Sequence, residues 1–153
     1  MSFYTSIVAN LLFPLQEHVK GHNTVRIRRA MDESQWWPPD RLEALRIDRL
    51  RRLLARAGEH VPYFRALFEE LGFHPEEVSS TRDLQRLPFL TKAVIRAEGE
   101  RMKSEAAVGL ARFNTGGSSG EPLIFFIGNE RVSHDVAAKW RATRWWNVDI
   151  GDP

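Results

Sequence analysis

The sequence predicts an α/β protein in which a mostly helical N-terminal segment is followed by a β-hairpin and a final helix. Apolar residues recur at helical spacing through most of the chain as far as residue 102. Two β-favouring runs, residues 110–115 and 123–127, flank a glycine-rich loop, and helical spacing returns after Asn129. Because a two-stranded ribbon is not an independent sheet, we expect the hairpin to be an incomplete part of a larger α/β domain.

The first predicted helix runs from Phe3 to about Lys20. Pro14 is expected to kink it or to end its first part, because proline removes a helical N–H group. The apolar run Ile7 to Leu15 is interpreted as one face of an amphipathic helix, with contact to a membrane surface as the alternative. It is too short to span a membrane, and no Lys or Arg precedes it as in a targeting signal.

Two further helices are predicted from their start and stop signals. One begins at Pro39-Asp40 and ends near Gly58, and a shorter one begins at Val61-Pro62 and closes at Gly72. The apolar face expected on the longer helix consists of Leu42, Leu45, Leu50, Leu53, Leu54 and Ala57.

Capping residues mark the remaining helices. Ser80 with Asp83 has the pattern of a capping box and opens a helical turn that Pro88 stops. Thr91 is the predicted N-cap of a helix running from residue 92 to about 102, and residues 103–109 are an irregular link. After the hairpin, Asn129 is expected to cap the final helix, which continues to Trp145 or Trp146.

Composition excludes several classes of function. The 153 residues carry 22 basic and 20 acidic side chains, a net charge of +2 that does not predict a nucleic-acid partner. The absence of cysteine excludes disulfides and thiolate chemistry. Trp140 shares a helical stripe with Val132 and Val136 and is expected in the core. The arginines of the longer helix are interpreted as a solvated face: Arg46, Arg49, Arg51, Arg52 and Arg56.

The loop that begins at Thr115 has the chemistry of a phosphate site. Glycines allow backbone N–H groups to converge on an anion, and neutral hydroxyls donate to phosphate oxygens. The spacing does not fit a P-loop, because Glu121 and Pro122 stand where the second glycine of that motif is required, and it does not fit a dinucleotide fingerprint. The candidate phosphate-binding residues are Thr115, Gly116, Gly117, Ser118, Ser119 and Gly120.

Two alternatives for this loop stay open. Gly116 to Gly120 also matches Gly-x-Ser-x-Gly, the nucleophile elbow of serine hydrolases, with Ser118 as nucleophile and His134 as base. An elbow turns from a strand into a helix, however, and here an apolar, β-favouring run follows the loop. The other alternative is a flexible hairpin connection without a ligand.

Four segments carry a resemblance to a known family. The loop resembles the Ser/Thr/Gly-rich signature of adenylate-forming enzymes. Val61-Pro62-Tyr63-Phe64-Arg65 and Leu87-Pro88-Phe89-Leu90-Thr91-Lys92 are similar, in order and spacing, to segments of the phenylacetate-CoA ligase and CapK-type branch. The end of the chain, with Trp145-Trp146 and Gly151-Asp152, resembles that branch's W-x-G-x-x-x-G-D segment, although Asn147 stands where glycine is usual.

The resemblance implies an ATP-dependent, AMP-forming carboxylate ligase. Such an enzyme forms an acyl-adenylate and then a thioester with coenzyme A, it requires Mg²⁺, and its loop closes on the ATP phosphates. Residues 1–109 would be a helical N-terminal region and residues 110–153 the truncated start of the AMP-binding core. A small carboxylate substrate, a cytoplasmic location and a role in capsular polysaccharide or aromatic acid metabolism are implied as well. Glu121 departs from the lysine of many relatives. A non-catalytic helical interaction module is the alternative from another class.

The family's adenine-binding, ribose-binding and catalytic lysine motifs lie beyond Pro153, so we expect residues 1–153 to be inactive alone. Purified chain incubated with ATP, Mg²⁺ and a carboxylic acid should release no pyrophosphate above the background without acid. A coupled pyrophosphate assay measures this directly. Clear acid-dependent release by this chain alone would contradict the interpretation.

Overall fold

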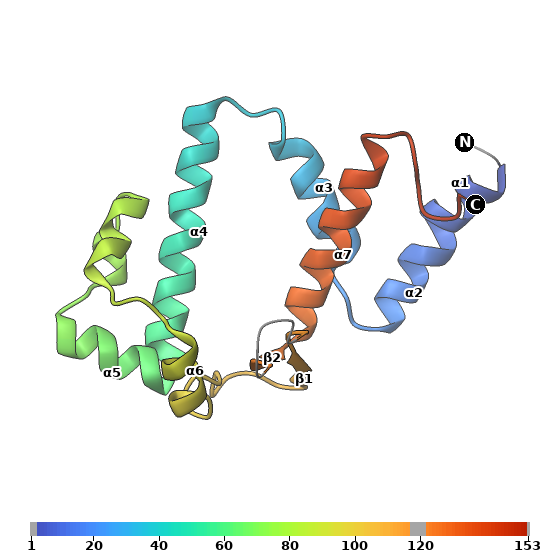
Figure 1. Ribbon diagram of the computed structural model, residues 1–153. Coiled ribbons are helices and arrows are strands. Elements are labelled where there is room, and N and C mark those ends of the chain that lie inside the picture. The colour runs from blue at the N-terminus through green and yellow to red at the C-terminus, as the bar shows by residue number, and fades with distance from the viewer. Residues whose placement is uncertain (1–2, 117–121, 153) are drawn as a thin grey trace. The chain divides into compact units, whose positions relative to one another are not determined.

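The computed structural model describes residues 3–116 and 122–152, and in these ranges the protein is mostly helical with one two-stranded sheet (Figure 1). The chain forms two compact units. The first combines the residues up to Trp37 with those from Ile127 onward, and the second comprises Pro38–Phe126. Each unit is described by itself.

The first unit begins with helical backbone that continues from residue 3 to residue 19. It consists of α1 (Phe3–Ile7), the π-helical segment η1 (Val8–Leu12) and α2 (Phe13–Val19). Pro14 does not end the helix. It lies in the first turn of α2, directly after the wider π-helical turns, where a missing N–H group is tolerated. Among the described residues, no helix is both long and apolar enough to cross a bilayer.

Two helices distant in sequence pack along one another in this unit: α3 (Thr24–Ser34) and α7 (Asn129–Arg144) (Figure 1). Helix α3 was not predicted, because Ile27 is the only apolar residue that it buries and arginines surround it in the sequence. The expected cap of α7 was also wrong by one residue. Gly128 occupies the N-cap position and Asn129 is the first helical residue.

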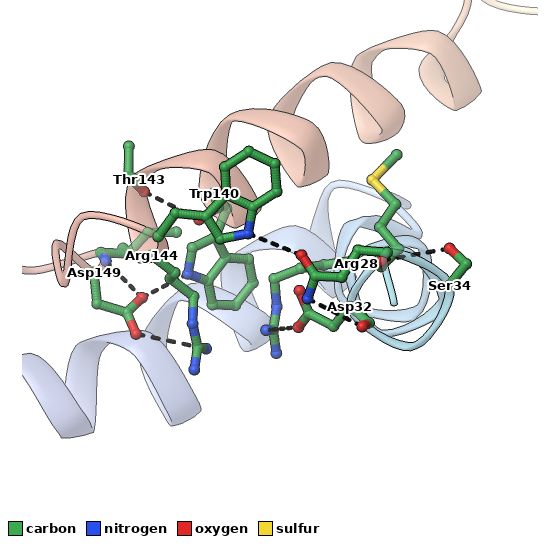
Figure 2. Close-up of polar contacts among 11 residues, drawn as sticks. Arg28, Asp32, Ser34, Trp140, Thr143, Arg144 and Asp149 are labelled. Atoms are coloured by element: carbon green, nitrogen blue, oxygen red, sulfur yellow. Dashed lines mark hydrogen bonds and ion pairs between the residues drawn. The ribbon is translucent and has the colours of Figure 1, made fainter. Parts of the chain in front are cut away.

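Trp140 is the centre of the first unit, as its helical stripe predicted. It is 4% exposed, and its indole N–H donates to the Asp149 carboxylate at 2.5 Å (Figure 2). The ring meets Phe13 edge-on at a centroid distance of 5.1 Å, and the Arg28 guanidinium lies 4.3 Å from its centroid. Trp140 therefore joins α2, α3, α7 and the segment after α7.

Glu17 is a second buried polar anchor in this unit. Its carboxylate is almost completely buried and accepts hydrogen bonds from Thr24 Oγ1 at 2.5 Å and from His22 Nδ1 at 3.1 Å. Burial raises the pKa of Glu17, but these two hydrogen bonds and the nearby charges of His22 and Lys20 outweigh it, so the pKa lies below its usual value. The carboxylate thus fixes the turn between α2 and α3.

The second unit is built on the long helix α4 (Pro39–His60) and on α5 (Pro62–Leu71). Gly58 does not end α4, which continues for two more residues. A Cβ atom at Gly58 would lie 3.0 Å from the Phe68 ring, so this glycine allows α5 to approach closely. The buried cluster consists of Leu54, Phe68, Phe73 and Val78.

The apolar face of α4 differs from the predicted one. Leu53 is 66% exposed and Leu42 is also exposed, whereas Ile47, which was not predicted, is buried. The solvated face was predicted correctly: Arg46 pairs with Glu43 and Arg52 with Asp48. Its five arginines are all exposed, namely Arg46, Arg49, Arg51, Arg52 and Arg56.

Short elements follow: η2 (Pro75–Glu77), η3 (Thr81–Arg86), which is a 3₁₀ turn, and α6 (Lys92–Glu98). The predicted caps are confirmed by Asp83 Oδ2, which accepts the Ser80 N–H at 2.8 Å, and by Thr91 Oγ1, which accepts the Val94 N–H at 3.2 Å. Gly72 ends α5 with φ of 56°. The strands are β1 (Ala111–Asn114) and β2 (Ile124–Ile127), which pair as an antiparallel hairpin, as expected.

Replacing Trp140 with phenylalanine keeps the apolar ring but removes the donor to the buried Asp149 carboxylate. We expect Trp140→Phe to lower the free energy of unfolding by about 1 to 3 kcal/mol. Urea denaturation followed by circular dichroism measures the change. Trp146 is 82% exposed and provides the control, and Trp146→Phe should change stability by less than about 0.5 kcal/mol. Equal effects of the two substitutions would contradict the anchoring role of Trp140.

The lowered pKa of Glu17 predicts an acid-dependent loss of stability. The unfolded carboxyl has a pKa near 4.5 and the folded one lies lower, so its contribution is fully present above 4.5 and is lost as pH falls through the folded value. In the Glu17→Gln variant the unfolding free energy should therefore decrease less steeply as the pH falls below 4.5. Urea titrations over the acid range measure this. Glu33→Gln, on the exposed side of α3, should leave the decrease unchanged.

Candidate functional site

The glycine-rich loop is closed at its base by a reciprocal pair of hydrogen bonds. The Thr115 N–H donates to the Leu123 carbonyl at 3.0 Å, and the Leu123 N–H donates to Thr115 Oγ1 at 2.9 Å. One step further from the loop, the rings of Phe113 and Phe125 stack across the two strands at 6.1 Å. The two ends of the loop are therefore held together by backbone, side-chain and ring contacts.

Thr115 serves this closure with its oxygen and keeps its hydroxyl proton. A threonine hydroxyl has one donor and two acceptor sites, and the Leu123 N–H uses one acceptor site. The Leu123 N–H therefore leaves the donor site of this hydroxyl unused. At Gly116, no described heavy atom lies within 4 Å of the position that a Cβ atom would take, so its backbone is open to an approaching group.

The structure describes two of the six predicted phosphate-binding residues. Thr115 and Gly116 lie side by side at the end of β1, whereas Gly117, Ser118, Ser119 and Gly120, together with Glu121, lie outside the described residues. A strand, β2, follows the loop. This is the expected context of a hairpin phosphate loop, and it differs from the helix that a nucleophile elbow around Ser118 requires.

A cavity of about 510 Å³ lies against β2 in the second unit. Its lining is mainly apolar, and the polar atoms at its wall include those of Lys103 and Glu100, whose side chains pair at 2.8 Å. Lys103 Nζ also lies 4.1 Å from the centroid of the Phe126 ring. The apolar lining includes Phe64, Leu90, Ile95, Met102, Leu123 and Phe126.

Three of the four segments that resemble ligase motifs contribute to this cavity or adjoin its lining. Phe64 comes from the first motif, Leu90 from the second, and Leu123 directly follows the loop motif. Sequence reasoning singled out each segment but missed the cavity. It also interpreted residues 103–109 as a mere link, although Lys103 forms part of the wall. Two backbone hydrogen bonds hold this part of the chain to the preceding helices: the Tyr63 N–H of α5 donates to the Arg101 carbonyl at 3.0 Å, and the Glu105 N–H donates to the His60 carbonyl of α4 at 2.7 Å.

The described residues contain no group of three or more histidine or acidic side chains placed to hold a metal ion. The charged pairs near the cavity instead join surface side chains. Arg65 donates to Glu105 at 2.6 Å and to the Glu59 carbonyl at the same distance. The chemistry in this region is therefore that of apolar surface and backbone donors.

The candidate site thus combines the paired ends of a loop that is rich in glycine and serine with a neighbouring, mainly apolar cavity. The chain is similar to phenylacetate-coenzyme A ligases. It is 39% identical over 64 residues to the enzyme of Thermus thermophilus, a stretch that covers 42% of this chain. The chain is also 39% identical to the enzymes of Aromatoleum evansii and Escherichia coli, in each case over 57 residues that cover 37% of this chain.

These matches confirm the predicted resemblance to adenylate-forming enzymes of the phenylacetate-CoA ligase type. The matched stretches span 14% of the length of the first relative and 13% of the other two. A search against protein-family models gave no match. The similarity is therefore to one part of a much longer enzyme.

Proposed function

We propose that this chain supplies the ATP phosphate-binding loop and the adjoining helical region of an AMP-forming carboxylate–CoA ligase. The observation that carries the proposal is the similarity to phenylacetate-CoA ligases, combined with a glycine- and serine-rich loop between two paired strands. In this proposal residues 1–109 form the helical N-terminal region. Residues 110–153 form the start of the AMP-binding core.

The proposed chemistry of the loop is electrostatic. Backbone N–H groups and the hydroxyls of Thr115, Ser118 and Ser119 would donate to phosphate oxygens and stabilise the charge that develops on departing pyrophosphate. Two observations on the described part of the loop support this role: no described heavy atom lies within 4 Å of a Cβ position at Gly116, and the Leu123 N–H uses only an acceptor site of the Thr115 hydroxyl. Glu121 would repel a triphosphate at close range, so we assign it no direct contact with phosphate.

ATP, Mg²⁺ and coenzyme A enter the proposal through the resemblance. ATP supplies the adenylyl group, Mg²⁺ neutralises its phosphates, and coenzyme A accepts the acyl group. The names of the relatives favour an aromatic carboxylic acid as substrate. Aromatic acid metabolism in the cytoplasm is therefore the proposed setting, and a role in capsular polysaccharide synthesis is the alternative within the same family.

Grafting the hairpin into an intact ligase tests the role of the loop. Residues 110–127 replace the corresponding segment of the Thermus thermophilus ligase, and pyrophosphate release is measured with phenylacetate and without it. We expect the graft to retain phenylacetate-dependent release. Thr115→Val should lower kcat/KM for ATP at least about tenfold, because it removes one of the two hydrogen bonds that close the loop and a proposed donor to phosphate.

Thr115→Ser is the matched control for this experiment. Serine keeps the hydroxyl that accepts the Leu123 N–H and can donate to phosphate, so the serine variant should stay close to the unsubstituted graft. A folded graft without activity, or equal kcat/KM values for the valine and serine variants, would contradict the proposal. Circular dichroism confirms the fold in each case.

A further inference from the structure

Lys103 contacts the hairpin from the residues that follow α6. Its ammonium donates to both carboxylate oxygens of Glu100 at 2.8 Å and lies 4.1 Å from the centroid of the Phe126 ring on β2. The Lys103 side chain is 30% exposed, whereas the Glu100 side chain is 87% exposed. The ammonium is therefore held between an acidic partner on the helical side and an aromatic ring of the hairpin.

The backbone on both sides of Lys103 is attached to the helices of the second unit. The Tyr63 N–H of α5 donates to the Arg101 carbonyl at 3.0 Å, and the Glu105 N–H donates to the His60 carbonyl of α4 at 2.7 Å. Each of these attachment points lies two residues from Lys103 in the sequence. The helices therefore set the position of Lys103 independently of the hairpin that it contacts.

The contact with Phe126 is connected to the glycine-rich loop through β2. Phe126 lies three residues after Leu123, whose N–H and carbonyl groups pair with Thr115 at the base of the loop. The ring of Phe125, the residue before Phe126, stacks on Phe113 of the other strand. Because the two strands are joined in this way, a displacement of Phe126 from the helices moves both ends of the loop.

The charge of Lys103 is compensated within the protein. An ammonium has three N–H donors, and the two Glu100 oxygens and the face of the Phe126 ring are three partners for them. A lysine that binds a phosphate directly would have to give up one of these partners. The contacts of Lys103 therefore favour a positioning role over direct contact with a ligand.

We propose that Lys103 is a positioning residue that holds the hairpin to the helices through Phe126 and thereby places the phosphate loop. The proposal deepens the ligase function proposed above and rests on it for the identity of the ligand, ATP. The contact itself can be tested without a ligand, so the two proposals can fail separately.

Hydrogen exchange followed by NMR on the 153-residue chain tests the positioning. Lys103→Met keeps the apolar stem but removes the charge, so the amides of Thr115 and Leu123 should exchange about twofold to thirtyfold faster, the range expected for the loss of a cation–π contact. Lys103→Arg keeps a cation over the ring and should restore the parent rates. Lys139→Met, at an exposed lysine of α7, is the matched control and should change neither rate.

The kinetics of a longer graft test the consequence for ATP. Residues 38–127 replace the corresponding segment of the Thermus thermophilus ligase, so that Lys103 is transferred together with its attachment points. We expect Lys103→Met to raise the KM for ATP about twofold to thirtyfold and to leave the KM for phenylacetate unchanged, and Lys103→Arg to restore the KM for ATP. A smaller fraction of folded enzyme would instead lower the apparent kcat and leave both KM values unchanged.

The two experiments distinguish failure of the positioning role from failure of the ligase function. Faster exchange in Lys103→Met together with an inactive parent graft would overturn the ligase function and leave the positioning role intact. The positioning role is overturned if the methionine and arginine variants exchange the Thr115 and Leu123 amides at equal rates. It is also overturned if an active graft has the same KM for ATP with lysine and with methionine at position 103.

Discussion

The hydrogen bond between the Trp140 indole and the Asp149 carboxylate is the interaction on which the first unit depends. A buried carboxylate must be compensated, and Asp149 receives this donor together with the Ile150 N–H at 2.8 Å and the Arg144 guanidinium at 3.6 Å. The bond turns the segment after α7 back toward the start of the chain, where Asp152 accepts the Thr5 hydroxyl. These two polar contacts together connect the two ends of the sequence, and the second of them buries Thr5 on the inner side of α1.

The second unit is organised by apolar packing instead. Its centre is the cluster around Leu54 and Phe68, and the glycine at position 58 lets α4 and α5 approach at that point. The rest of the unit extends from this cluster to the cavity beside β2. Polar contacts there act mainly at the ends of elements, as Asp83 does at the start of η3. Backbone hydrogen bonds from Ser79 and Ser80 lower the pKa of Asp83, in keeping with a capping role.

Features encoded by adjacent residues could be predicted, and features created by distant contacts could not. The hairpin strands, the Ser80 capping box and the Thr91 cap follow from local chemistry, and the structure confirms them. Helix α3 was missed because its stability comes from packing against α7 and not from its own pattern. Periodicity also places apolar residues inside, so it could not reveal that Thr5 and Glu17 are buried while Leu11 is exposed. The cavity required three separate segments to meet, which no local pattern describes.

The candidate site depends both on features encoded by adjacent residues and on contacts between distant residues. Fixing a backbone in one conformation costs entropy, and this cost is highest for glycine. The reciprocal pairing of Thr115 with Leu123 fixes the two ends of that loop before any ligand arrives, so less order remains to be imposed on binding. Local composition therefore identifies which ligand groups the loop can bind. The strand pairing outside the loop determines how much conformational entropy is lost when a ligand binds. Thr115 belongs to both, because its oxygen closes the loop and its hydroxyl is a proposed donor to phosphate, which makes it the residue where fold and proposed function are most closely joined.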